Sequence, residues 1–380
     1  MLKNKIYKYL TLEIFKSFLT ILFAFTTIAW TVRAVNFLDL MVEDGYSVLV
    51  YLEYSLYNIT TILARFIPLS FLFALIISIL KFERQHELII LWTSGLSKIK
   101  IVNLFFSISI VVTIMQILWS VIITPTTLNK SRSLLKSSEI ELISSVIRSK
   151  DFSDTFEQIT FYVEEKNENN EMLNIFIRDN TNALGTIVSA GNQNANTTIV
   201  ANKGVVRNNK LILFNGFIQS QSQTGEINNI EFNKTILTMN NFSTRTITTP
   251  KIQETSTLSL LQCFFNLGSS EKSILNCPYK KNKVEVAQNI SRRIGMPLYI
   301  PLIALIGSFL LIHKRREKFG FLKKYLFFLI SFFVLVFSEI MVKFSGLSLF
   351  NFLIYFLFPF TLMPIVYFML IQSIKSENLI

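Results

Sequence analysis

Charged side chains beside long apolar segments are the residues of this sequence best suited to chemistry. Arg33 lies near the end of one apolar segment, and Arg292 and Arg293 precede another. Arginines in such places bind phosphates or carboxylates of amphiphilic headgroups, although an isolated one also snorkels to ordinary lipid. Glu339 and Lys343 are one helical turn apart in the acid-first order. They predict a local ion pair, with a gate contact to another subunit as the alternative.

A second group of residues predicts a docking helix. The run Glu83–Ser97 (ERQHELIILWTSGLS) starts with Glu83 and Glu87 one turn apart, where acids suit the helix dipole, and Gly95 supplies a stop. Its apolar face is formed by Leu88, Leu91 and Trp92. The helix either docks a partner or lies on the bilayer as a connector, and composition favours neither interpretation.

Motifs for catalysis are missing from the sequence. It contains no G-x-x-x-x-G-K-[ST], H-E-x-x-H or G-x-S-x-G pattern, and its two histidines, His86 and His313, both lie at predicted helix ends. Glu164 and Glu165 lie in a charged tract that ends a strand, where a solvated turn is a simpler interpretation than a catalytic dyad. We therefore expect a protein that is not an enzyme, binds no cofactor or metal, and takes energy for any transport from a partner.

Six apolar segments must position these residues. They are Phe18–Val35, Ile59–Phe82, Ile99–Ile123, Ile294–Ile312, Tyr325–Val342 and Leu347–Ile371. Each is long enough to cross a hydrocarbon core of about 30 Å. With 51% hydrophobic residues and a mean hydropathy of +0.45, the chain is predicted to be an α-helical membrane protein with six spans.

Basic residues predict the orientation. Lysines and arginines gather before the first span, between the second and third, and between the fourth and fifth, whereas the loop after the first span is acidic. The positive-inside rule then places both termini in the cytoplasm and residues 125–289 outside, in the periplasm of a two-membrane bacterium. The net charge of +12 follows from this topology, and no nucleic-acid motif accompanies it.

The sequence thus divides into residues 1–124 with three spans and the docking helix at about 83–96, residues 125–289 with linkers, and residues 290–380 with three more spans. The middle part alternates in short strands: Gln158–Glu164, Leu173–Arg178, Gly185–Ala190, Thr197–Asn202, Val205–Arg207 and Lys210–Phe214. Hairpin turns are predicted at Asn202-Lys203-Gly204, Asn208-Asn209 and Thr224-Gly225. A meander in a sandwich, jelly roll or open barrel is expected.

Residues 255–283 are predicted to be an irregular polar return to the membrane. This segment contains Cys263 and Cys277, the two cysteines of the chain. An oxidising compartment would allow a bridge between them, but two cysteines alone do not establish one.

Several motifs resemble one family. The run at Glu83–Ser97 is similar to the coupling-helix signature of the lipopolysaccharide export permeases LptF and LptG, roughly S-E-L-x-V-x-x-A-x-G-[LIM]-S, from which His86 and Trp92-Thr93 depart. The resemblance extends to Tyr9–Ser17, to ANKGVVRNNKLILFNG at Ala201–Gly216 and to VAQNISRRIGMPL at Val286–Leu298. The order of the strand elements looks more like LptF than LptG.

The resemblance implies a fold, partners and roles. It implies six transmembrane helices with a periplasmic β-jellyroll between helices 3 and 4, and an ABC transporter of the inner membrane that exports lipopolysaccharide for outer membrane biogenesis. The implied partners are an LptG-type permease, a dimeric LptB-type ATPase that uses the ATP, and LptC- or LptA-type bridge jellyrolls. Glu87 would contact the ATPase, with Leu88, Gly95 and Leu96 shaping the helix, while the jellyroll would accept acyl chains.

Two alternatives remain. A mechanotransmitting permease usually has one span before its outer domain and three after, so the three-plus-three layout argues against it. A non-transport envelope scaffold would need fewer spans and would tolerate charge reversal at Glu87.

Overall fold

The computed structural model describes most of the chain in two compact units. The described residues are 2–42, 46–146, 150–156, 159–167, 171–179, 196–207, 210–221, 227–238, 251–265, 280–312 and 320–378. The helical unit comprises residues 1–33, 57–129 and 251–380, and the second unit comprises residues 34–56 and 130–250.

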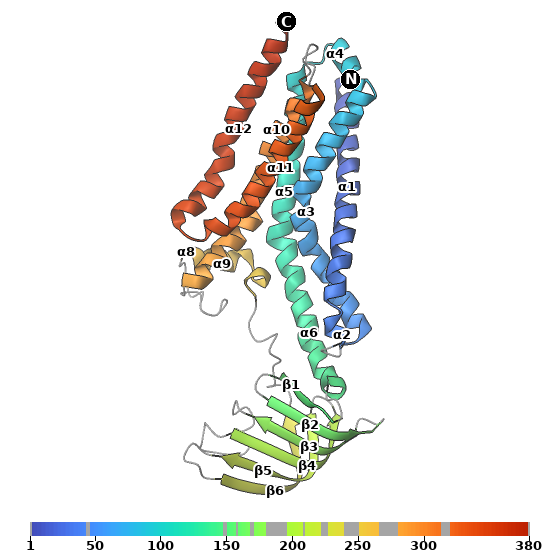
Figure 1. The fold of residues 1–380 in the computed structure, drawn as a ribbon, viewed down its shortest axis with the longest axis vertical. Coiled ribbons are helices and arrows are strands. Elements are labelled where there is room, and N and C mark those ends of the chain that lie inside the picture. The colour runs from blue at the N-terminus through green and yellow to red at the C-terminus, as the bar shows by residue number, and fades with distance from the viewer. Residues whose placement is uncertain are drawn as a thin grey trace. The chain divides into compact units, whose positions relative to one another are not determined.

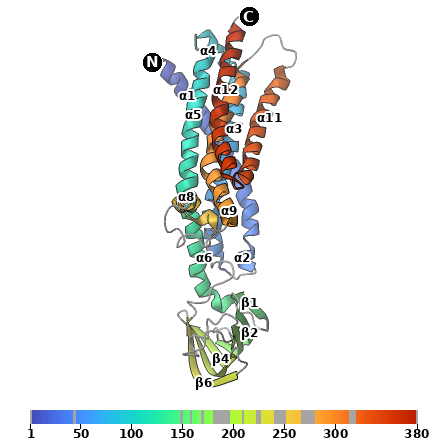
Figure 2. The same cartoon turned by 90° about the vertical axis from the view of Figure 1, so that its left-hand side faces the viewer.

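Long helices run side by side in the helical unit (Figures 1 and 2). The long helices that contribute to it are α1 (Leu2–Asn36), α3 (Val48–Arg84), α5 (Lys98–Leu118), α6 (Thr124–Val146), α11 (Gly320–Ser345) and α12 (Leu349–Asn378). Shorter elements are α4 (Glu87–Thr93), η1 (Trp119–Ile123), η3 (Ile252–Glu254), α8 (Thr257–Phe265), α9 (Lys280–Ile290), η5 (Ser291–Gly295), η6 (Met296–Leu298), α10 (Tyr299–Gly307) and η7 (Ser308–Leu311). Six helical stretches of the described chain are long and apolar enough to cross a membrane, as predicted.

The fourth span is longer than its hydropathy predicts. We expected Ile294–Ile312, whereas the continuous helical stretch runs from Lys283 to Leu311. Its first turns carry polar side chains that lower the mean hydropathy, but Val286, Ala287 and Ile290 are buried on one face. An amphipathic entry of this kind is invisible to a search for uniformly apolar residues.

The fourth span is also the centre of the helical unit. All nine residues of α10 are buried, and α10 packs against α5, α11 and α12. Residues with large apolar side chains on the outer surfaces of α11 and α12 stay exposed, among them Phe333, Phe350 and Phe368. A helix that is apolar all round belongs in a core, and exposed apolar rows suit lipid.

The predicted polar return at 255–283 is only partly irregular. Its described part contains helix α8, in which Leu260 and Cys263 are fully buried beside Val286 and Ile290. Figures 1 and 2 place α8 and α9 toward the end of the helical unit opposite to the marked termini. Cys263 is disulfide-bonded, and Cys277 lies outside the described residues.

The second unit contains the predicted meander. Six antiparallel strands pair in chain order: β1 (Phe152–Phe156), β2 (Ile159–Lys166), β3 (Glu171–Asp179), β4 (Asn196–Arg207), β5 (Lys210–Gln221) and β6 (Ile227–Thr238). Alternate side chains such as Phe161, Ile177 and Leu213 form its buried apolar core. The unit also includes the short helix α2 (Asp39–Val42). The predicted fold class, six spans with an inserted β domain, is confirmed.

One predicted turn is wrong. Asn202-Lys203-Gly204 does not separate two strands, because β4 runs unbroken through it and pairs with β3 and β5 on either side. A Cβ at Gly204 would lie 2.3 Å from Ile175 Cδ1, so this glycine provides room for a neighbouring strand's side chain. The predicted turns at 208–209 and 224–225 and the predicted strand at 185–190 lie outside the described residues.

Candidate functional site

Two π-helical turns meet where the fourth span faces the third. They are η1, which follows α5, and η5, which contains Arg292 and Arg293. A π-turn inserts a residue into the helix, disturbs its regular hydrogen bonds and is frequent at functional sites. Here Ser120 Oγ of η1 donates to the Arg293 carbonyl of η5, at 2.7 Å. Side chains of one span therefore complete the backbone hydrogen bonding of another.

Pro68 creates a similar need in α3. Proline lacks an N–H, so the carbonyl of Ala64, four residues earlier, loses its helical donor. Gln116 Nε2 of α5 donates to this carbonyl at 3.1 Å. The proline explains why a glutamine is buried at this position, a residue that sequence reasoning did not select.

The Arg293 side chain is hydrogen-bonded within the protein. Its side chain is buried, Nη1 donates to the Thr255 carbonyl at 3.0 Å and to Thr257 Oγ1 at 2.8 Å, and Nη2 donates to the Gln253 carbonyl at 2.8 Å. Thr257 Oγ1 in turn donates to the carbonyl of Val121 in η1, at 3.1 Å. Arg293 thus joins the segment before α8 to the two π-turns, and its guanidinium already has three acceptors within the protein.

Arg292 pairs with another helix. Its Nη2 donates to Glu339 Oε1 of α11 at 2.8 Å, and these side chains are 32% and 47% exposed, so a ligand can reach both. The predicted ion pair between Glu339 and Lys343 is wrong, since none joins them in the described chain. Arg292 supplies a planar donor from the neighbouring span, while the backbone carbonyl of Lys343 accepts a hydrogen bond from Gln288.

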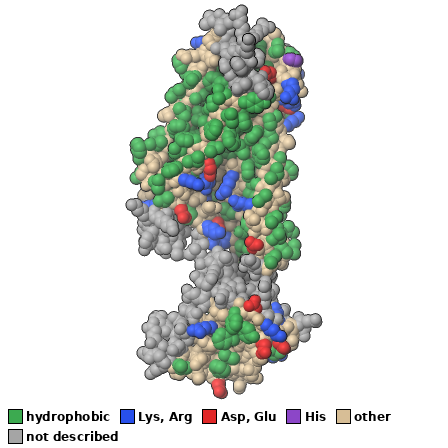
Figure 3. Space-filling model, viewed as in Figure 1, with side chains coloured by type: hydrophobic (Ala, Val, Ile, Leu, Met, Phe, Trp, Pro, Cys, Tyr) green, Lys and Arg blue, Asp and Glu red, His purple; other side chains and the backbone are tan. Residues whose placement is uncertain are grey.

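Arg65 and Arg33 extend the positive charge. Arg65 is exposed on α3, and Arg33 lies in the last turns of α1. The charges of Arg33, Arg292 and Glu339 all act on Arg65, so three cations and one anion share this region. We call Arg33, Arg65, Arg292 and Glu339 the charged cluster. Figure 3 shows basic and acidic side chains interrupting an otherwise apolar face of the helical unit.

Beside the charged cluster lies a small polar cavity of about 60 Å³. Its lining includes Arg65, Arg292, Thr61 and Gln116. Thr61 Oγ1, Gln116 Oε1 and Arg292 Nε are buried and have no hydrogen-bond partner among the described residues. Such a cavity has the volume and the polar partners that bound water requires.

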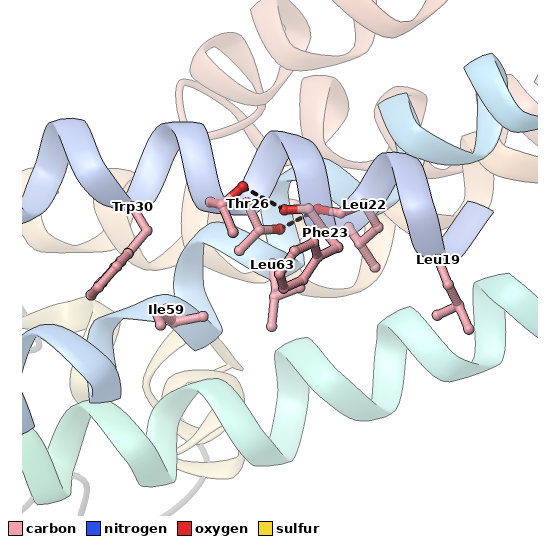
Figure 4. A pocket seen from close by; sticks show the side chains of 8 residues that line it. Leu19, Leu22, Phe23, Thr26, Trp30, Ile59 and Leu63 are labelled. Carbon is pink, nitrogen blue, oxygen red and sulfur yellow. Dashed lines mark hydrogen bonds between the residues drawn. The ribbon is translucent and has the colours of Figure 1, made fainter. Parts of the chain in front are cut away.

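A larger apolar pocket is lined by α1 and α3, the helices that carry Arg33 and Arg65. It has a volume of about 410 Å³ and is lined by Leu19, Leu22, Phe23, Thr26, Thr27, Trp30, Ile59 and Leu63. Figure 4 shows Trp30 and Phe23 of α1 facing Ile59 and Leu63 of α3. The two threonine hydroxyls donate to carbonyls of their own helix, so they offer the pocket no free polar group. The pocket suits a hydrocarbon chain.

The predicted docking helix is shorter than its sequence pattern. Helix α4 contains Glu87–Thr93, while Glu83 lies in the last turns of α3. His86 adopts a left-handed conformation with φ 58°, which ends α3 and separates Glu83 from Glu87. The expectation of two acids one turn apart at one helix start is therefore wrong.

The predicted apolar face of α4 does pack inward. Leu88 is buried, and Leu91 and Trp92 pack against the main apolar core. Ile89 and Ile90 remain 57% and 63% exposed, so the opposite side of α4 is an open apolar surface. Both faces of the helix are apolar, which favours contact with something besides water.

A Schellman motif closes α4. Gly95, with φ 82°, donates its N–H to the Trp92 carbonyl at 3.1 Å, and Leu96 donates to the Leu91 carbonyl at 3.2 Å. Leu96 is buried, which is the apolar contact that accompanies this motif. Gly95 and Leu96 thus shape the end of the helix through its geometry.

Two contacts join α4 and the end of α3 to the start of α1. Tyr9 Oη donates to Glu87 Oε1 at 3.0 Å, and Lys81 pairs with Glu13. Sequence reasoning missed Tyr9, although the motif Tyr9–Ser17 pointed to this segment. One carboxylate oxygen of Glu87 is therefore engaged within the chain.

These features define a class: a multi-pass membrane protein with an inserted β domain, an arginine-rich charged cluster among its spans, and a short exposed helix between the second and third spans. A sequence model described as "Lipopolysaccharide export system permease LptF/LptG" matches residues 8–373. The chain therefore belongs to the LptF/LptG family of permeases. It is also similar to an uncharacterized protein of Rickettsia prowazekii (strain Madrid E), with 25% identity over 302 residues, 78% of this chain and 80% of that protein.

Proposed function

We propose that this permease takes lipopolysaccharide from the inner membrane, driven by a cytoplasmic ATPase, and passes it to a periplasmic bridge. The observation that carries this proposal is that α1 and α3 contribute both two arginines of the charged cluster and the lining of the apolar pocket. Trp30 of the pocket lies one turn before Arg33 on α1, and Leu63 lies two residues before Arg65 on α3. The same two helices thus offer cations to a phosphate and a dry slot to an acyl chain.

Arg33, Arg65 and Arg292 are the residues we assign to the headgroup. Cations near apolar surface bind an anionic amphiphile more strongly than in water, because the local dielectric constant is low. We do not include Arg293, since its guanidinium already has three acceptors in the protein. The β domain would receive the acyl chains, consistent with its extensive apolar core.

Helix α4 is the proposed contact for the ATPase. Ile89 and Ile90 supply exposed apolar area, and the second carboxylate oxygen of Glu87 is available to a cation on the partner. Both termini lie at the same end of the helical unit as α4 (Figure 1), and basic residues in the neighbouring loops favour the cytoplasm for that end. The β domain is then periplasmic, and a second permease subunit of the same family completes the transporter.

The decisive experiment reverses the charge of Glu87. The chain is co-expressed with its cognate ATPase and partner permease, purified in detergent, and assayed for lipopolysaccharide release from liposomes. We expect wild type to retain the ATPase and release lipid, and Glu87→Lys to do neither, because the new cation repels the partner's cationic site.

Two control variants isolate this effect. Tyr9→Phe removes the internal hydrogen bond to Glu87 but keeps the acid, and Glu285→Lys reverses an exposed charge on α9. Both should retain the ATPase. If Glu87→Lys also retained it and transported lipid normally, the coupling assignment would be wrong, and a wild-type chain with neither property would indicate an envelope scaffold.

A further inference from the structure

Arg292 is held incompletely by its protein partner. A guanidinium has five N–H donors and fits a two-oxygen acceptor best. The described contact uses one of them, Nη2 to Glu339 Oε1. The Nε atom is buried and has no acceptor in the described part of the chain. Glu339 therefore orients the Arg292 side chain but leaves its buried Nε donor without an acceptor.

A second unsatisfied donor lies against the same π-turn. A Cβ built on Gly295 would be 2.4 Å from Tyr355 Cε1, so the Tyr355 ring rests directly on η5. The Tyr355 hydroxyl is buried without a partner among the described residues, and the charges of Arg292 and Glu339 act on it. Each of these donors, one on η5 and one on the ring packed against it, lacks an acceptor that an anionic oxygen could supply.

Charge balance points the same way. Glu339 is the one acid of the charged cluster, which contains three arginines. A second anion that approaches Arg292 gains from these cations but is repelled by the carboxylate of Glu339. Since both side chains are partly exposed, Glu339 has room to leave. Helix α11, which carries it, has a candidate span of which only 22% is buried.

We propose that Glu339 is a resident competitor for Arg292. Without lipid it pairs with the arginine, and a phosphate of an anionic lipid displaces it and takes Arg292 as its ligand. Glu339 thereby sets the affinity and favours release, because it returns to Arg292 when the lipid leaves. This inference rests on the proposed function, in which the charged cluster binds the headgroup.

The test measures binding to the full chain in nanodiscs of uncharged phosphatidylcholine. The probes are lipid A with two phosphates and a phosphate-free analogue. Glu339→Gln should bind lipid A about tenfold more tightly than wild type, since a neutral amide competes less well for a cation. Glu339→Asp, which keeps the charge on a shorter side chain, should gain less and serves if the glutamine variant fails to fold.

Two controls identify the mechanism. Glu285→Gln removes an exposed acid from α9 and should leave the affinity unchanged. In an Arg292→Gln background, replacing Glu339 should bring no gain, because the contested cation is absent. The phosphate-free analogue should bind to all of these proteins with the same affinity.

The outcomes separate the two proposals. Lipid A binding that is equal in wild type and both Glu339 variants, or weaker in the variants, overturns the competitor role and leaves the proposed function standing. If none of the proteins binds lipid A, both proposals fall. If the Glu339 variants also bind the phosphate-free analogue more tightly than wild type, Glu339 acts on packing and the inference is wrong.

Discussion

Gly95 shows how one residue can fix the candidate coupling helix without contacting a partner. Its φ of 82° lies in the left-handed region, where side chains with a Cβ are strained. Nothing lies within 4 Å of a Cβ built there, so the requirement for glycine is conformational and not steric. The stop signal was readable from the sequence because glycine after a helix has this one common use.

We predict that Gly95→Ala loosens the end of α4 by about 1 kcal/mol, the cost of the left-handed conformation. Hydrogen exchange of the amides of Gly95 and Leu96 should accelerate, while the melting temperature of the helical unit should hardly change. A matched Ser94→Ala variant, at the ordinary backbone angles of the C-cap, should leave exchange nearly as in wild type. Equal acceleration in both variants would contradict a conformational role.

Contacts between residues that are far apart in the chain could not be predicted from the sequence. Arg292, Glu339 and Lys343 all carry charge near their span ends, and the i,i+4 spacing favoured the local pair. The structure instead pairs Arg292 with Glu339 because η5 presents the guanidinium toward α11. A π-turn is set by packing among spans, so its effect on side-chain direction has no local sequence signature.

At the scale of elements, the helices of this unit depend on one another for backbone hydrogen bonds. Pro68 leaves the Ala64 carbonyl without a donor in α3, and Gln116 of α5 supplies one. Lipid supplies no such donor, so it must come from the protein or from a bound water. The apolar spans could be predicted from hydropathy, but the polar pairing that fixes α5 against α3 could not, because it depends on which faces meet.

We predict that Gln116→Leu lowers the free energy of unfolding by about 1–2 kcal/mol, because it leaves the Ala64 carbonyl unsatisfied. In Pro68→Ala the backbone N–H returns, so the same Gln116→Leu change should cost much less there. Thermal unfolding in detergent of the wild type, both single variants and the double variant gives the coupling energy. Additive effects would show that the proline and the glutamine act independently.

In the β domain, too, the sequence predicted the strands only in part. Alternating residues predicted β2, β3 and β5, but Gly204 was misread as a turn because glycine in a strand and glycine in a hairpin look alike in sequence. The glycine is explained by the neighbouring strand β3, because the Ile175 side chain occupies the space that a Cβ at Gly204 would need. Strands β1 and β6 were not predicted, since they are polar and their apolar residues include exposed ones such as Phe152 and Ile230.

For the molecule as a whole, Cys263 connects structure to orientation. It is fully buried in α8, next to α9, and is disulfide-bonded. Disulfides persist in oxidising compartments such as the bacterial periplasm. The predicted topology places residues 125–289 on that side of the membrane, and a bonded Cys263 agrees with that orientation.

We predict that Cys263 is alkylated in denatured, freshly isolated membranes only after reduction. In a strain without its periplasmic thiol oxidase, the residue should react without reduction. Mass spectrometry of the alkylated peptide measures both states. A Cys263 that reacts fully without reduction in the normal strain would place this segment in the cytoplasm and reverse the proposed topology.

The unbroken helix α1 has a mechanical consequence. It carries Tyr9 and Glu13 near its start, against α4 and the end of α3, and Arg33 near its end, in the charged cluster. Arg33 lies 24 residues after Tyr9, which is about 36 Å along the helix at 1.5 Å per residue, with no proline or π-turn between them. If α4 docks the ATPase and Arg33 binds lipid, as proposed, a displacement of α4 is carried along this straight helix to Arg33, and no segment between them has to refold.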